Sequence, residues 1–224
     1  MLHVPAVLSG PTLARVHSII GQAKWVAGAQ TAGHLSIKVK DNEQIAEDDP
    51  VGHEAASVIL DALSTNPLFV SAALPAKISP PLFNRYAGGG SYGRHIDGAI
   101  RPLGAQRMRT DLSATLFLSD PASYDGGELM IADSGSINSI KLAAGDMILY
   151  PSGSIHEVRA VTKGIRVASF FWVQSLVRDA GQRALLFDLD TTIQAMADGE
   201  DSHDHRLSLT ALYHNLLRMW ADIS

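Results

Sequence analysis

Two side chains of the kinds that commonly bind metals, His95 and Asp97, are separated by a single residue. Alternate side chains of a β-strand point to the same face, so a strand over residues 92–99 directs this imidazole and this carboxylate into one volume. A third such side chain, His156, follows far downstream. Two histidines and one carboxylate on one face of an octahedron suit Fe(II), whereas catalytic zinc more commonly takes a tetrahedral set richer in nitrogen or sulfur. The three residues therefore predict a catalytic iron site.

A cation, Arg166, lies in the next strand-like segment after His156. If residues 162–164 join strands 156–161 and 165–173 into a hairpin, Arg166 shares the inward face with His156. The two positions are then offset by four residues, roughly 13 Å, which a metal-bound five-carbon diacid and a long arginine side chain together can span. The alternative is a surface arginine paired with a local carboxylate. The hairpin geometry favours the first arrangement, in which Arg166 binds a dicarboxylate co-substrate.

The chemistry-bearing residues occur in an order that resembles a known family. In chain order they are Tyr92, His95, Asp97, the segment Asp125–Leu129, His156 and Arg166. This order resembles the Fe(II)/2-oxoglutarate dioxygenases of the prolyl-4-hydroxylase superfamily. More narrowly, nearly the whole chain resembles the bacterial PKHD-type hydroxylases associated with iron uptake. The segments that carry this narrower resemblance are Pro81–Tyr86, Arg109–Leu118 and Leu185–Asp190.

The resemblance implies an enzyme with Fe2+ bound by the three ligands and 2-oxoglutarate as co-substrate, its distal carboxylate on Arg166. It also implies L-ascorbate to restore oxidised iron. Tyr86 and Tyr92 match positions whose tyrosines hydrogen-bond the co-substrate or line its pocket. Phe117 departs from the pattern, because some prolyl hydroxylases carry there a tyrosine that assists the arginine. Tyr86 or Ser113 is a candidate to replace that hydroxyl.

The implied reaction is hydroxylation of a substrate C–H bond, with release of succinate and CO2. A non-catalytic cupin-like sensor of iron or 2-oxoglutarate is the alternative, because ligands sufficient for binding are also those required for catalysis. The open positions of the metal favour the enzyme. The substrate is left open between peptidyl proline or lysine and a small siderophore-like or xenobiotic molecule.

Composition limits the partners of the protein. A chain of 224 residues with 46% apolar residues is long enough for a packed core. The net charge of -5 and the pI near 5.9 predict no general affinity for nucleic acid or an anionic membrane, although Arg101, Arg107 and Arg109 form a local basic group. Cysteine is absent, which excludes disulfides. Since no apolar stretch approaches the ~20 residues of a membrane span, we expect a cytoplasmic protein.

Hydrophobic periodicity predicts a mainly β protein with added helices, in three parts. Residues 1–66 are expected to form an N-terminal helical flank, 67–175 the dioxygenase core, and 176–224 a C-terminal helical hairpin. The resemblance implies that the core is a double-stranded β-helix, the cupin-like form of a jelly roll. The apolar stripes of the hairpin pack either on the core or on a second subunit, so a homo-oligomer through these helices stays open.

Within these parts, helices are expected from Ser9 to Gly21 and from Gly52 to Leu63, separated by a polar and irregular segment over residues 26–50. Between Leu68 and Val173 the pattern indicates about nine short strands and no helix. The break of the C-terminal hairpin is expected at Gly199–Ser202.

Overall fold

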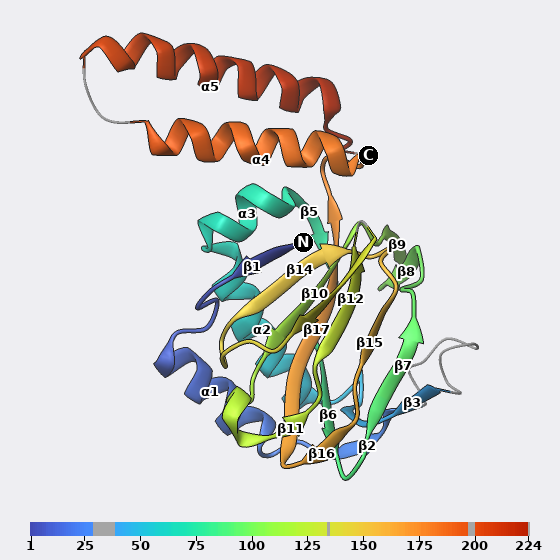
Figure 1. The fold of residues 1–224 in the computed structure, drawn as a ribbon. Coiled ribbons are helices and arrows are strands. Elements are labelled where there is room, and N and C mark those ends of the chain that lie inside the picture. The colour runs from blue at the N-terminus through green and yellow to red at the C-terminus, as the bar shows by residue number, and fades with distance from the viewer. Residues whose placement is uncertain (29–38, 134, 197–199, 224) are drawn as a thin grey trace.

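Two antiparallel sheets face each other in this protein, and helices cover the outer face of one of them (Figure 1). The computed structural model describes residues 1–28, 39–133, 135–196 and 200–223. Among these, no single helix is long and apolar enough to cross a membrane, and α2 (Pro50–Ser64) and α3 (Pro67–Ala73) reach the required length only as a pair bent by 84°.

The larger sheet has eight strands in the order β1–β14–β10–β17–β6–β4–β2, with β5 paired to β17. Three of its strands come from the N-terminal segment, where the sequence pattern predicted helices and irregular structure. The strand bounds are β1 Leu2–Val4, β2 Trp25–Ala27, β4 Glu43–Ile45, β5 Pro75–Ile78, β6 Leu82–Ala87, β10 Leu112–Phe117, β14 Met147–Pro151 and β17 Ile165–Ser175.

The smaller sheet has the order β13–β12–β15–β7–β3. Its strands are β3 Lys40–Asp41, β7 Ser91–His95, β12 Leu129–Asp133, β13 Ser136–Ile140 and β15 His156–Val158. Two short strand pairs complete the β structure: β8 (Ile100–Leu103) with β9 (Gln106–Arg109), and β11 (Asp125–Gly126) with β16 (Val161–Lys163). From β6 to β17 the chain passes repeatedly between the two large sheets, which is the winding of a double-stranded β-helix. The predicted jelly-roll core is therefore confirmed.

Strict alternation along the larger sheet separates a helix-covered core from the interior between the sheets. On β10, Leu112, Ala114 and Leu116 belong to the core that includes the helices, and Phe117 belongs to the cluster between the sheets. Ser113 and Thr115 point to the same side of the sheet as Phe117 and line a cavity there. The larger sheet thus places every second side chain where a ligand could be bound.

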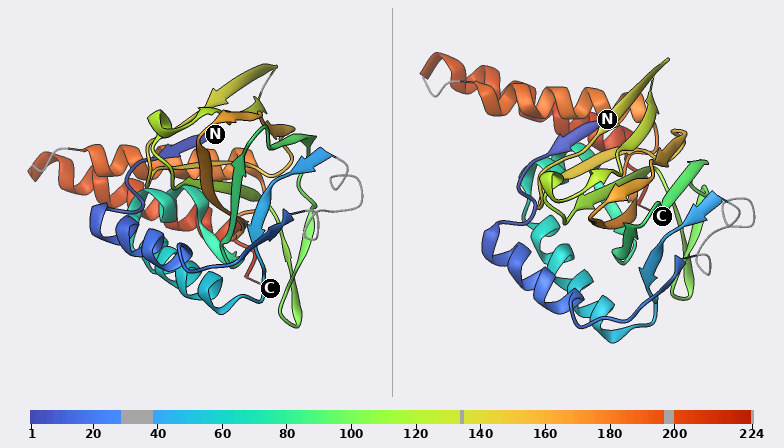
Figure 2. Two further views of the ribbon diagram at one scale, coloured as in Figure 1. Left: turned by 90° about the horizontal axis from the view of Figure 1, so that it is seen from below. Right: turned by 60° about the horizontal axis from the view of Figure 1, so that its bottom comes forward.

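Helices α1 (Gly10–Ile20) and α2 lie along one side of the β core, as Figure 2 shows. The side chain of Asp49 caps α2 by accepting from the backbone N–H of Val51 at 2.8 Å. Helix α3 was not predicted, because the pattern from Leu68 onward indicated strands and no helix, and Asn66 and Pro67 precede that stretch. Instead, Asn66 accepts from the backbone N–H of Phe69 at 2.9 Å and Pro67 takes the first helical position, so the same pair starts a helix.

The C-terminal hairpin, α4 (Ala180–Ala195) and α5 (Glu200–Trp220), extends beyond the β core (Figures 1 and 2). It is attached near its base, where Leu74, Val177 and Leu186 form a small apolar cluster of their own. Arg109 also lies 3.8 Å from the carboxylate of Asp222. The predicted hairpin is confirmed, although α5 already includes Glu200 to Ser202, and the residues before Glu200 lie outside the described part.

Candidate metal and co-substrate site

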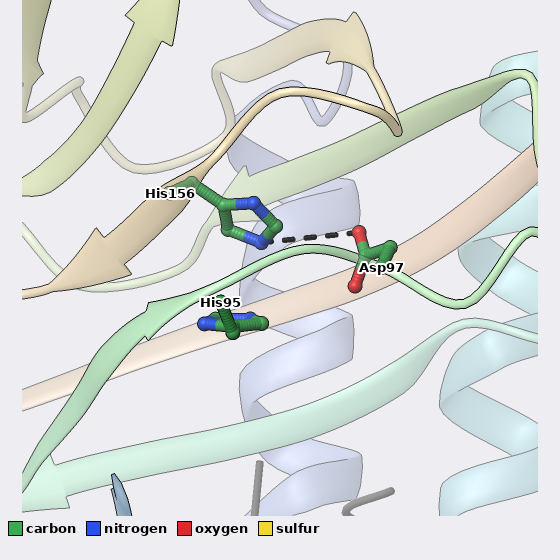
Figure 3. Close-up of side chains that lie close together, drawn as sticks. All are labelled: His95, Asp97 and His156. Atoms are coloured by element: carbon green, nitrogen blue, oxygen red, sulfur yellow. Dashed lines mark ion pairs between the residues drawn. The ribbon is translucent and has the colours of Figure 1, made fainter. Parts of the chain in front are cut away.

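The three predicted metal ligands converge at one place between the sheets (Figure 3). His95 is the last residue of β7 and His156 the first of β15, and the two lie directly opposite each other in the antiparallel pairing. Asp97 lies just beyond β7, which ends earlier than the predicted strand. The potential ligand atoms are all within 4.8 Å of one another, and Nε2 of His156 is 3.8 Å from Oδ2 of Asp97. Within the described residues, no other such cluster of three occurs.

Backbone carbonyls orient both imidazoles. Nδ1 of His95 lies 2.8 Å from the carbonyl oxygen of Gly93, and Nδ1 of His156 lies 3.0 Å from that of Ser154. Each Nδ1 therefore carries the proton and donates it to a carbonyl, which leaves the Nε2 lone pair for a metal. Burial, followed by the charge of His156, lowers the pKa of His95 to about 4. His95 is thus neutral at pH 7, as a metal ligand must be.

The carboxylate of Asp97 is held by a buried serine pair. The hydroxyl of Ser113 donates to Oδ2 of Asp97 at 2.6 Å and is itself 2.8 Å from the hydroxyl of Ser152. Aromatic rings hold the histidines: Tyr92 stacks on His95 with ring centroids 3.6 Å apart and an angle of 16° between the planes. These neighbours orient the ligand set before any metal binds.

Arg166 is a buried cation that is paired with no carboxylate among the described residues. Its side chain is 1% exposed, and none of its three guanidinium nitrogens forms a hydrogen bond within the described residues. The guanidinium lies 5.4 Å from the ring centroid of Tyr86 and 5.2 Å from that of Phe117. Because an unpaired buried charge is costly, this arrangement suits an anion bound from the cavity. A surface arginine, the alternative considered above, is excluded.

The predicted hairpin between the strands of His156 and Arg166 is wrong. The two residues lie in opposite sheets, β15 in the smaller and β17 in the larger, and both line the same cavity of about 670 Å³. The chain crosses between the sheets by way of β16 and turns at Gly164, whose φ is 73°. A side chain at this position would collide with the carbonyl oxygen of Ser123, so the turn requires glycine. Arg166 and the metal ligands therefore converge across the cavity.

Comparison with known proteins identifies the family. Residues 81–174 match the model of the 2OG-Fe(II) oxygenase superfamily, and residues 180–222 match that of the PKHD-type hydroxylase C-terminal domain. A PKHD-type hydroxylase of Xanthomonas campestris is 51% identical over 227 residues, covering 100% of both chains, and one of Burkholderia ambifaria is 54% identical over 226 residues, covering 99% of both. The chain belongs to the PKHD-type hydroxylase family. It is therefore an Fe(II)- and 2-oxoglutarate-dependent hydroxylase, and the sensor alternative is not retained.

Solved structures of distant relatives share the fold of this PKHD-type hydroxylase. A prolyl hydroxylase from Trichoplax adhaerens aligns with a TM-score of 0.58 at 17% identity, covering 82% of this chain and 86% of that one. The epimerase SnoN from nogalamycin biosynthesis aligns with a TM-score of 0.56 at 15% identity, covering 79% and 78%. At such low identities, the similarity shows a shared fold and does not show a shared activity.

The two tyrosines predicted to contact the co-substrate lie in the cavity of the hydroxylase. Tyr86 pairs with Arg166 across neighbouring strands and is fully buried. Burial raises the pKa of Tyr86 to about 12, so its hydroxyl keeps its proton and can donate to a ligand while accepting from Nδ2 of Asn84 at 3.3 Å. Tyr92 contacts His95 through its ring, so its position fits support of a metal ligand as well as lining of the pocket.

Sequence reasoning missed several residues of the site. The hydroxyl of Tyr124 is buried without a hydrogen bond of standard geometry, and burial raises its pKa while the nearby charge of Arg166 lowers it. Tyr124 is thus the hydroxyl near Arg166 that the sequence did not suggest, although it directly precedes the Asp125–Leu129 segment. Ser113, considered for that position, contacts Asp97 instead. Ser152, whose hydroxyl lies 2.8 Å from that of Ser113, was not among the predicted site residues.

Proposed function

We propose that His95, Asp97 and His156 bind the Fe(II) of this hydroxylase and that Arg166 binds the distal carboxylate of 2-oxoglutarate. The observation that carries the proposal is the fully buried guanidinium of Arg166, in the cavity that the three potential ligands also line. Its nitrogens form no hydrogen bond of standard geometry within the described residues. A planar guanidinium presents paired N–H groups that match a carboxylate. The donor set of two imidazoles and one carboxylate matches that of non-haem Fe(II) sites.

The residues of the chain supply orientation and a protected interior. His95 and His156 present Nε2 because their Nδ1 protons are bound to carbonyl groups, and Ser113 leaves one oxygen of Asp97 for the metal. Bound Fe(II) and 2-oxoglutarate together supply the activation of O2 that hydroxylates a C–H bond and releases succinate and CO2. Apolar side chains such as Leu129 line the cavity and keep water from the reacting atoms.

The remaining expectations are also proposals. The substrate is a small molecule or a peptidyl residue rather than nucleic acid or a membrane, and the cavity of about 670 Å³ supports a compact target. Ascorbate restores iron oxidised in unproductive turnovers, and the enzyme works in the cytoplasm, where 2-oxoglutarate is a central metabolite. The link with iron uptake stays a prediction from the resemblance.

The architecture supports two further proposals. The small separate core of the hairpin supports the division into an N-terminal part (1–66), a dioxygenase core (67–175) and a C-terminal hairpin (176–224). The N-terminal part nevertheless contributes strands β1, β2 and β4 to the larger sheet, which it shares with the core. Exposed apolar side chains on the hairpin support a homo-oligomer formed through these helices.

Anaerobic titration of 2-oxoglutarate with Fe(II) tests the proposed roles through the visible charge-transfer band of the chelate. Arg166→Ala should weaken 2-oxoglutarate binding by about 10²–10³-fold, because truncating one side of a buried charge pair costs roughly 3–5 kcal/mol. Arg166→Lys should weaken it less, since lysine offers one compact charge in place of a planar pair of donors. His95→Ala and His156→Ala should abolish the band at moderate iron concentration.

Arg159→Ala is the matched control, because Arg159 is an exposed arginine in the segment between the same two strands. It should bind 2-oxoglutarate as wild type does. The role of Arg166 is contradicted if its alanine variant binds within about fivefold of wild type, a difference of roughly 1 kcal/mol. An undiminished band in both histidine variants removes these residues from the ligand set.

A further inference from the structure

A second cation, Arg101 on β8, also lines the cavity. Its guanidinium stacks on the indole of Trp172, 3.7 Å from the ring centroid, and its side chain is 26% exposed. Its carboxylate neighbour, Glu47, is 4.0 Å away and 55% exposed. An ion pair of this length and exposure contributes little, so the stacking holds the guanidinium while its N–H edge stays accessible to a ligand.

Arg101 lies at a different level of the cavity from Arg166. Trp172 and Arg166 are both on β17 and six residues apart, so they point to the same face with Cα atoms roughly 20 Å apart. Both residues line the cavity, as does Asp97, which Ser113 holds at the level of Trp172. A five-carbon diacid anchored on Arg166 and chelating the metal spans only part of that length. Arg101 is therefore left for a different molecule.

The charges of the site, with Fe(II) and 2-oxoglutarate bound, support an anionic substrate. Fe(II), Asp97, Arg166 and the two carboxylates of 2-oxoglutarate cancel one another. In the cavity lining, Lys40 and Arg101 are two cations close to each other, and the carboxylate of Glu47 lies near both. Burial, followed by the positive charge of Arg101, lowers the pKa of Lys40 to about 8, so the two cations disfavour each other until an anion enters.

We propose that Arg101, positioned by Trp172, binds the carboxylate of the substrate, and that the substrate class is a small organic acid with an apolar body. This inference rests on the proposed function of the metal and of Arg166. Leu82, Phe170 and Trp172 line the cavity beside Arg101, and they suit an apolar body next to the anion. The guanidinium edge provides two parallel N–H donors for a carboxylate, which a neutral amide cannot match.

The test uses the anaerobic complex of enzyme, Fe(II) and saturating 2-oxoglutarate, titrated with matched pairs of probes: benzoate and benzamide, and phenylacetate and phenylacetamide. In wild type, the carboxylates at millimolar concentration should perturb the charge-transfer band and the carboxamides should not. Arg101→Gln should weaken the response to carboxylates by about tenfold or more, and Arg101→Lys should be intermediate, because it keeps the charge without the planar donors.

Arg107→Gln is the matched control, because Arg107 is an exposed arginine on the paired strand β9 and does not line the cavity. It should respond within about twofold of wild type. Formation of the band in Arg101→Gln shows that the cavity is intact in that variant. Equal responses to acids and amides, no response to either, or an unchanged response in Arg101→Gln overturns the inference while the proposed function stands. Failure of wild type to form the band counts against the proposed function instead.

Discussion

Ser113 illustrates how the position of one side chain decides which ligand it assists. Its sequence context left it as a candidate partner of Arg166, but Ser113 pairs with Trp172 on β17, six residues away from Arg166. At that level of the cavity its hydroxyl meets Asp97 at 2.6 Å. A hydrogen bond from an outer side chain to a ligating carboxylate orients it and tunes its affinity for the metal.

Removing this hydroxyl should therefore weaken iron binding. We expect Ser113→Ala to lower Fe(II) affinity by roughly 10–100-fold, the usual effect of losing such a partner. Fe(II) titration without co-substrate measures it. Ser136→Ala, an exposed serine on β13, should leave the affinity as in wild type. Iron affinity within about twofold of wild type in Ser113→Ala would show that the Ser113 contact does not support the ligand set.

At the scale of elements, a glycine turn makes room for Arg166, the residue proposed to bind the co-substrate. Gly127 follows β11 with a φ of 68°, and a Cβ at this position would lie 2.9 Å from Cδ of Arg166 and 2.8 Å from Cγ2 of Val161. This glycine lies in the Asp125–Leu129 segment, which carries part of the family resemblance. The structure adds a physical reason for glycine at this position: the absence of a side chain at Gly127 leaves space for the stem of Arg166 as it enters the cavity.

The C-terminal hairpin carries apolar side chains that the rest of the described chain leaves exposed. Leu212 and Met219 are seven residues apart on α5, so they share a helix face, and they are 47% and 75% exposed. If this face joins two subunits, Leu212→Asp combined with Met219→Asp should convert a dimer to a monomer, because it introduces charges into a buried apolar contact. Sedimentation velocity at micromolar concentration measures the change.

Ile137→Asp is the control for this prediction, since Ile137 is an exposed apolar residue of β13, outside the hairpin. It should leave the association state unchanged. A monomeric wild type at these concentrations, or a dimer that survives the double substitution, contradicts an interface at this face.

At the scale of the whole molecule, the buried charge of Arg166 lowers the free energy of unfolding while no ligand is bound to it. Arg166 is 1% exposed and forms no hydrogen bond within the described residues. Removing an unsatisfied buried polar group relieves a penalty of roughly 1–3 kcal/mol. We expect Arg166→Met to raise the free energy of unfolding of the metal-free protein by roughly 1–2 kcal/mol, measured by urea denaturation.

The same variant should lose the stabilisation that ligands provide. Wild type with Fe(II) should gain about 2.7 kcal/mol at a 2-oxoglutarate concentration one hundred times Kd, whereas Arg166→Met should gain little beyond the effect of iron alone. Arg159→Met, at an exposed position, should change neither quantity appreciably. A metal-free Arg166→Met protein less stable than wild type would mean that the guanidinium is compensated in the folded chain.

The local chemistry of the site could be predicted from the sequence because it depends on residue types and on short spacings. His95 and Asp97 are close in the chain, so even a strand that ends at His95 leaves them adjacent in space. The alternating pattern of the strands and the helical stripes of the hairpin likewise depend on neighbours within a few residues. The family resemblance added the order of His156 and Arg166 to this local information.

The tertiary structure decided which distant residues meet. The sequence predicted one hairpin for His156 and Arg166, whereas the turn at Gly164 sends their strands into opposite sheets. Which sheet a strand joins depends on pairing with strands far away in the chain, such as β6 with β17, and local periodicity carries no information about that choice. Tyr124 beside Arg166, and Arg101 on Trp172, follow from the same long-range pairing. The sequence by itself thus determined the ligands and the chemistry, while the closure of two sheets determined the cavity in which they act.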